Sequence, residues 1–181
     1  CKTNLNYVII DKDVTIKDGR SLMGFDSYPI YIAKKSVVKK KKKQMRILYC
    51  ASEANPFCGS GGLADVAGSL PHTLCRKGQD CRLVVPLYGT IPQELRTSMN
   101  FITHFTVPVA WRHQYCGLFW ARWHDCTYYF IDNEYYFKRG TLYGHYDDAE
   151  RFAFFSRAIL EMLPYIDFHP DIIHCNDWQT A

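Results

Sequence analysis

The sequence predicts an α/β fold, and three observations support that prediction. A short apolar run rich in strand-forming residues at 46–51 is followed by a glycine-rich loop. A helical pattern of apolar residues begins at Gly62, and a second apolar run follows at 81–86. This strand–helix–strand order is typical of a parallel sheet. With 181 residues, 48% of them hydrophobic, the chain can bury a sizeable core.

The remaining elements have signals of their own. Gly78 lies just past the first helix as a stop signal, and the apolar face of that helix is formed by Leu63, Val66, Ala67, Leu70 and Leu74. Apolar runs at 101–109, 115–123 and 127–132 predict further strands, partly antiparallel. An amphipathic helix is predicted at 149–163, and a strand at 171–175 leads into a polar turn at 176–178.

The first 33 residues follow a different pattern. Ile10, Ile16 and Leu22 recur at a spacing of six, which is the period of a left-handed β-helix coil. A few such coils cannot bury their apolar face without neighbours. The sequence therefore predicts a β-helix-like remnant at 1–33, a basic linker at 34–44 and an α/β domain at 45–181.

The positive charge is confined to the predicted linker. Eight of the 22 basic residues lie at 34–46, whereas 47–181 carries ten basic and fourteen acidic residues, a balance of −4. A nucleic-acid-binding domain spreads its cations over a folded face. We interpret the lysine run as a solvated linker, with a nucleic-acid or membrane-surface tail as the alternative. No apolar stretch approaches the roughly 20 residues of a membrane-spanning helix. We expect neither nucleic acid nor membrane as a partner.

The eight cysteines indicate reduced thiols rather than a disulfide framework. They include no CxxC pair, and no Cys/His group has zinc-finger spacing. The chain is large enough to fold without cross-links, and no signal peptide is expected. We therefore expect a cytoplasmic protein with no bound metal.

The loop before the first helix carries the chemistry. It contains Gly59, Gly61 and Gly62, and glycines let the backbone come close to a ligand. The N–H groups and dipole of the following helix N-terminus favour an anion such as a diphosphate. The alternative is a glycine-rich helix start that binds nothing.

The same glycines loosely fit the dinucleotide fingerprint, which would indicate a nicotinamide enzyme. Two observations oppose that interpretation. The loop at 51–59 is longer than the tight turn of the fingerprint, and the second strand ends without an acidic residue to hold a ribose.

Several segments resemble the bacterial glycogen synthases and plant starch synthases, in order and at the family's spacing. Residues 46–53 read RILYCASE and resemble the family's opening strand. Residues 61–66 read GGLADV and resemble the end of its KTGGLADV signature. Later segments also resemble the family: 129–136 (YFIDNEYY), 148–152 and 170–178 (PDIIHCNDW). The resemblance covers about 45–181.

The resemblance implies one Rossmann-like half of a two-Rossmann-domain (GT-B) glucosyltransferase, which needs no cofactor or metal. Such an enzyme moves glucose from ADP-glucose to the non-reducing 4-OH of an α-1,4-glucan, with retention. Ser60, Gly61, Gly62 and Asp65 would bind the nucleotide-sugar donor. Asp177 would be catalytic beside the donor glucose, and Trp178 and His174 would border the acceptor cleft.

Each of these residues also has a structural interpretation. Asp65 could complement the helix dipole, Asp177 could cap the next helix, and Trp178 could belong to the core. His174 fits a packed histidine at a strand end. Oligomeric state cannot be read from the sequence.

The sequence departs from the family pattern at two positions. Gly59 stands where the family usually has a lysine, so a cation expected near the donor is missing and ADP is less firmly implied over UDP. Gln179 replaces a usual histidine. We also expect the domain to be truncated and inactive alone, since the family closes a cleft between two domains.

Residues 1–38 resemble the C-terminal β-helix tail of ADP-glucose pyrophosphorylase, through NYVIIDK at 6–12, DGR at 18–20 and YPIYIAK at 28–34. None of that enzyme's catalytic motifs is present. Two other hypotheses stay open. One is a non-catalytic α-glucan-binding module that uses surface aromatics, and the other is a pyrophosphorylase fragment.

Overall fold

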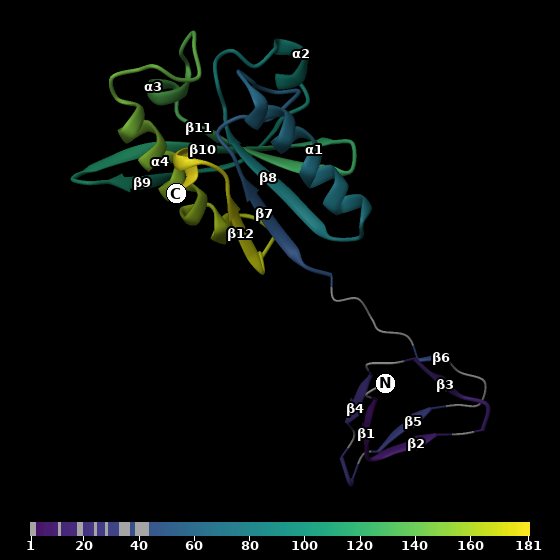
Figure 1. The fold of residues 1–181 in the computed structure, drawn as a ribbon. Helices are drawn as coiled ribbons and strands as arrows, with labels where there is room; N and C mark the ends of the chain where they lie inside the picture. Colours follow the sequence, from purple (N-terminus) through teal and green to yellow (C-terminus); the bar gives the residue numbers. More distant parts are fainter. Residues whose placement is uncertain are drawn as a thin grey trace. The chain divides into compact units, whose positions relative to one another are not determined.

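The chain divides into two compact units, Cys1–Lys43 and Gln44–Ala181 (Figure 1). The computed structural model describes residues 3–10, 12–17, 20–23, 25–27, 29–32, 37–38 and 44–181.

Unit 1 is built from short parallel strand pairs. Three two-stranded sheets pair β1 with β4, β2 with β5 and β3 with β6. Asn4 is in register with Ser21 and Val8 with Ile30. Each strand of one coil therefore lies beside the corresponding strand of the next coil. This is the geometry of a β-helix, as predicted. The strands are β1 (Asn4–Asn6), β2 (Val8–Ile10), β3 (Thr15–Ile16), β4 (Ser21–Met23), β5 (Ile30–Ile32) and β6 (Val37–Val38).

Unit 1 leaves much of its apolar surface open. Ile32 is buried, but Tyr31 and Phe25 are 63% and 74% exposed. Ile10, one of the residues at the predicted spacing of six, is also exposed. So few coils bury little apolar surface, as expected for a solenoid without neighbours. Strand β6 lies within the range 34–44 that was predicted as a linker, and its backbone pairs with β3. The other residues of 34–43 lie outside the described part of the chain.

Unit 2 is organised around a six-stranded sheet with the order β12-β7-β8-β11-β10-β9 (Figure 1). The first four of these strands run parallel, and β10 is antiparallel to both of its neighbours. The strands are β7 (Arg46–Cys50), β8 (Asp80–Pro86), β9 (Asn100–Val109), β10 (Arg112–Trp123), β11 (Cys126–Asp132) and β12 (Ile172–Cys175). Every predicted strand is present, which confirms the α/β class.

Two long helices cover this sheet. Helix α1 (Gly62–Arg76) joins β7 to β8, and α4 (Asp148–Glu161) lies on the way from β11 to β12. Gly78 has a left-handed φ of 82° just after α1, which confirms it as the helix stop. Short helices complete the unit: α2 (Gln93–Arg96), α3 (Glu134–Phe137), η1 (Leu163–Tyr165) and η2 (Trp178–Thr180).

The strand order creates a topological switch point. From β7 the chain crosses to β8 on one side, and later it returns to place β12 on the other side of β7. Right-handed crossovers in opposite directions put α1 and α4 on opposite faces of the sheet. In open α/β sheets, ligands bind at the carboxyl ends of the strands where the order reverses. A ligand site is therefore expected at the two loops that follow β7 and β12.

The core is dense around the central strands and thins out at β12. Leu48, Tyr49 and Cys50 of β7 are fully buried, whereas every residue of β12 is exposed. Strand β12 forms an edge of the sheet within the described residues. None of the helices in the described part of the chain has the length and apolar character needed to span a bilayer.

Candidate functional site

The candidate site lies where β7 and β12 end side by side. Cys50 and Cys175 are in register, so the residues that follow each strand emerge at the same edge. The backbone N–H and the side-chain amide of Asn176 both donate to the Cys50 carbonyl, at 3.1 and 2.8 Å. These two hydrogen bonds fix the turn that carries Asp177 beside the loop that follows β7.

A buried glutamate shapes the glycine-rich loop. Glu53 is 4% exposed, and its Oε2 accepts from the Ser60 backbone N–H at 2.5 Å and from the Ser60 hydroxyl at 2.9 Å. The carboxylate thus fixes the residue just before Gly61. The Ser60 hydroxyl thus helps to hold the loop, and its contact with a donor stays a prediction.

The N-terminus of α1 is open toward solvent. Gly61 is its N-cap, and no side chain caps the helix there. A Cβ built on Gly61 or Gly62 would meet nothing within 4 Å. Gly61 has an extended backbone with φ −168°, and neither glycine has a positive φ. These two glycines are therefore required neither by packing nor by backbone conformation, and they leave free space in front of exposed N–H groups.

Gly59 differs from these two glycines. A Cβ there would lie 2.7 Å from the Ala64 Cβ and 2.8 Å from the Asn55 Oδ1, closer than atoms can pack. Any side chain at 59 would have to displace the start of α1 or the preceding loop. The packing of this loop therefore leaves no room for the lysine that the family usually has at this position.

Asp65 holds the loop to the helix. It is exposed in the first turn of α1, and its Oδ1 accepts from the Asn55 side-chain amide at 2.7 Å. The carboxylate therefore positions the loop as well as complementing the helix dipole. Its predicted contact with a donor stays a prediction.

Asp177 combines the features of a cap and of a functional residue. Its side chain accepts from the Trp178 N–H at 2.7 Å, which caps η2. Its φ is 64°, a left-handed conformation that is uncommon for a residue with a Cβ. Such backbone conformations cluster at functional sites. The exposed carboxylate lies at the switch point, in the polar turn that was predicted after the strand at 171–175. Its place beside a donor glucose stays a prediction.

The other predicted cleft residues divide into two groups. Trp178 is 54% exposed, so it does not belong to the core. Its ring packs edge-on against that of Phe152, with the two ring centroids 5.3 Å apart. His174 stacks on Tyr49 at 4.8 Å, which matches a packing role; its place in an acceptor cleft stays a prediction. Gln179 is buried, and its Oε1 has no hydrogen-bond partner in the described residues.

Tyr143 belongs to the site, although no sequence pattern pointed to it. Its hydroxyl lies 2.8 Å from the Ser52 hydroxyl, just after β7. Burial raises the pKa of Tyr143, and the nearby carboxylates Glu53 and Asp177 raise it further. The phenol therefore stays protonated and can donate a hydrogen bond in the site. Only the three-dimensional contact could have revealed it, since it lies in a loop without periodicity.

Comparisons with known proteins agree with this geometry. Residues 46–181 match the family model of the starch synthase catalytic domain. The glycogen synthase of Clostridium botulinum (strain Alaska E43 / Type E3) is 59% identical over 137 residues, covering 76% of this chain and 29% of the relative. The glycogen synthase of Geobacillus stearothermophilus is 57% identical, covering 76% of this chain and 28% of the relative.

A solved structure shows the same fold. The catalytic domain of starch synthase IV from Arabidopsis thaliana, bound to ADP and acarbose, superposes with a TM-score of 0.69 at 30% identity. The match covers 76% of this chain and 29% of that one. The chain thus spans less than a third of the length of these relatives.

The fold and the site define a class: the Rossmann-like part of a GT-B glycosyltransferase. More narrowly, the chain belongs to the starch synthase catalytic domain family, through residues 46–181. The family match does not include residues 1–45, so the pyrophosphorylase resemblance of 1–38 stays a prediction.

Proposed function

We propose that this chain is the donor-side part of a glycogen or starch synthase. The whole enzyme would transfer glucose from ADP-glucose to the non-reducing 4-OH of an α-1,4-glucan, with retention at the anomeric carbon. The single observation that carries the proposal is that the loop leading to the open α1 N-terminus and the turn that carries Asp177 follow two strands, β7 and β12, that end side by side. A relative bound to ADP and acarbose, a nucleotide and a sugar ligand, supports it.

The residues of this chain suit the donor side of such a reaction. The scissile bond leaves a diphosphate, and the N–H groups at Gly61 and Gly62 would stabilise the charge that develops on it. No side chain competes for that space, because the N-terminus lacks a cap. Asp177 would lie beside the donor glucose, and the Tyr143 hydroxyl would donate to a sugar or phosphate oxygen.

The preference for ADP over UDP is part of the proposal. The usual lysine is replaced by Gly59, whose packing leaves no room for a side chain. Donor affinity must then rest on the backbone N–H groups and on the part of the enzyme that this chain does not span. Competition between ADP and UDP for the same site measures the preference.

We expect the 181-residue chain alone to bind ADP without transferring glucose. It spans 29% of the length of its relative, and transfer in a GT-B enzyme depends on a closed, water-excluded cleft. The measurement is incorporation of label from radioactive ADP-glucose into glycogen, with a full-length relative as the positive control. Elongation of glycogen by the purified chain would contradict this expectation.

The proposal also covers unit 1 and the cellular setting of the protein. The parallel coils of unit 1 support a β-helix tail like that of ADP-glucose pyrophosphorylase, an enzyme that produces ADP-glucose. The seven cysteines within the described residues are free, which supports a reducing, cytoplasmic setting. A separate α-glucan-binding module is disfavoured, because such a module needs no open helix N-terminus at a switch point.

A further inference from the structure

A second pocket lies away from the switch point, on the other half of α1. It has a volume of about 560 Å³, and it is lined by α1, by the tip of the β10–β11 hairpin and by Asn55 and Pro56 of the loop that follows β7. Small-molecule sites usually measure about 300–1,000 Å³. His72 is ten residues beyond Gly62, which places it about 15 Å along the helix axis. The α1 residues of the pocket therefore lie beyond the helix N-terminus, although Asn55, which also lines the pocket, donates a hydrogen bond to Asp65 near that end.

Three charged or titratable side chains that line this pocket have no polar partner in the described part of the chain. Arg76 comes from the last turn of α1, and His124 and Asp125 come from the hairpin tip. Within the described part of the chain, no carboxylate pairs with the Arg76 guanidinium, and no hydrogen bond reaches the His124 ring or the Asp125 carboxylate. Convergent polar groups beside an aromatic side chain, here Trp123, are the usual composition of a ligand site.

The two histidines hold the shape of the pocket. The His72 Nε2 lies 2.9 Å from the Tyr128 hydroxyl, and the His72 and His124 rings meet edge to face at 6.0 Å. The His124 ring also packs against Trp123 at 4.9 Å. Burial lowers the pKa of His72, and the neighbouring His124 lowers it further. His72 is thus neutral near pH 7, and Arg76 is the permanent cation.

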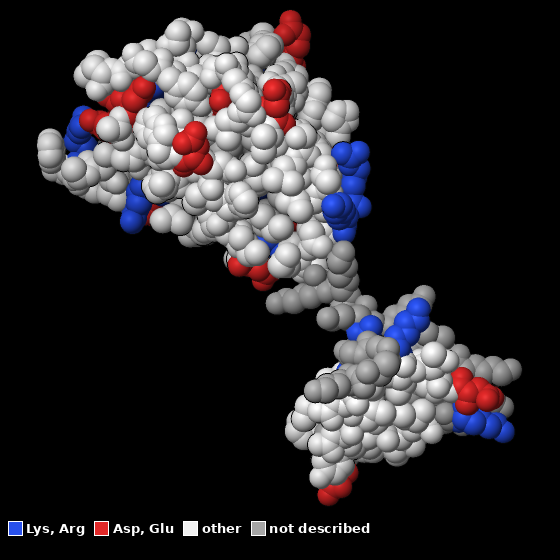
Figure 2. Space-filling model, in the orientation of Figure 1, with Lys and Arg blue, Asp and Glu red and all other residues white. Residues whose placement is uncertain are grey.

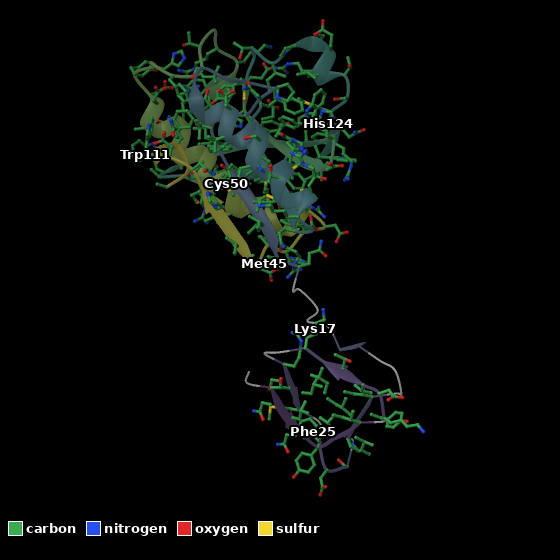
Figure 3. All side chains as sticks on the ribbon, turned by 45° about the vertical axis from the view of Figure 1, so that its right-hand side comes forward. Lys17, Phe25, Met45, Cys50, Trp111 and His124 are labelled. Carbon is green, nitrogen blue, oxygen red and sulfur yellow. The ribbon has the colours of Figure 1, made fainter. Side chains whose placement is uncertain are left out.

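The surroundings favour an anion. Figure 2 shows basic side chains gathered on the side of unit 2 where α1 ends, with acidic ones mostly elsewhere on that face. An adjoining pocket of about 600 Å³ shares Arg76 and Asp125 and adds Arg82, Arg122 and Asp80, so its lining carries three basic and two acidic side chains. Like charges around a hollow raise the local concentration of a ligand of opposite charge. Figure 3 shows His124 at the rim of unit 2, within reach of solvent.

We propose that this pocket binds a sugar phosphate. Arg76 would hold the phosphate through charge-assisted hydrogen bonds, for which the guanidinium is well suited. Trp123 would contact the apolar face of the sugar ring, and Asp125 would accept hydrogen bonds from its hydroxyl groups. The proposal does not depend on the activity proposed above, because it concerns a different pocket.

The test is calorimetric titration of the full 181-residue chain with glucose 1-phosphate. We expect saturable binding that Arg76→Gln weakens by about tenfold, the loss typical of one charge-assisted contact. His124→Asn should weaken it severalfold; asparagine tolerates the left-handed φ of 49° found at this position. The matched control is Arg157→Gln, which removes a helix arginine that pairs with Glu161 on α4.

Four outcomes would overturn the proposal. Absence of saturable binding would do so, as would equal affinity for inorganic phosphate, which would reveal an anion site without sugar recognition. Equal weakening by Arg157→Gln would indicate a charge effect at no particular site. Displacement of glucose 1-phosphate by excess ADP would assign the binding to the switch point. Thermal unfolding of each variant shows that it is folded.

Discussion

Replacing Arg151 with methionine should destabilise unit 2 by about 3–5 kcal/mol, the usual loss when one partner of a buried ion pair is removed. Arg151 is fully buried on α4. Its guanidinium donates to the Tyr136 carbonyl at 2.8 Å, to the Leu142 carbonyl at 3.1 Å and to the Asp148 carboxylate at 2.5 Å. Methionine has no donor, so the Tyr136 and Leu142 carbonyls and the Asp148 carboxylate would lose the guanidinium as a partner.

The matched control lies on the same helix. Arg157→Met removes an exposed arginine that pairs with Glu161 four residues on, and such pairs contribute about 0.3–0.5 kcal/mol. Urea unfolding followed by tryptophan fluorescence measures both variants, because all four tryptophans lie in unit 2. Equal losses of stability in the two variants would contradict the role given to Arg151.

Replacing Gly62 with alanine should lower the affinity for ADP by tenfold or more and leave the fold intact. A methyl group there meets no protein atom within 4 Å, so it would occupy the space in front of the helix N-terminus. Alanine in the first turn of a helix is also favoured over glycine by up to about 1 kcal/mol. Calorimetric titration with ADP and thermal unfolding measure the two effects separately.

Gly59→Ala should show the opposite pattern. Its methyl group would collide with Ala64 and Asn55, and such overpacking typically costs about 1–3 kcal/mol. The loop would lose stability, whereas the space in front of Gly61 and Gly62 would stay open. If Gly62→Ala binds ADP as tightly as the unmodified chain, the diphosphate does not approach this helix end.

The strands and the two long helices of unit 2 were predictable because each carries a local signal, whereas the short helices α2, α3, η1 and η2 were not predicted. The apolar run before the glycine-rich loop became β7, and the stop signal at Gly78 became the left-handed residue after α1. Wherever a segment is buried on both faces or on one stripe, its sequence pattern and its conformation agree. The strand order itself, with β12 beside β7, required the structure or the family resemblance.

The site was only partly predictable, for a physical reason. Glycines before a helix leave a sequence signal, so Gly61 and Gly62 could be named in advance, whereas Asp177 was named through the family resemblance. Tyr143 could not, because its contact with Ser52 joins two loops 91 residues apart. The role of Gly59 likewise depends on the distance from its position to Ala64, which no one-dimensional pattern contains.

The central claim is that the switch point between β7 and β12 binds the nucleotide of the donor. Titration of the isotopically labelled chain with ADP, followed by amide resonances in ¹H–¹⁵N spectra, tests it most directly. We expect saturable shifts at Gly61 and Gly62, with smaller ones at Asp65 and Asp177. Shifts confined to the pocket around His72 and His124, or no saturable shifts at all, would contradict it.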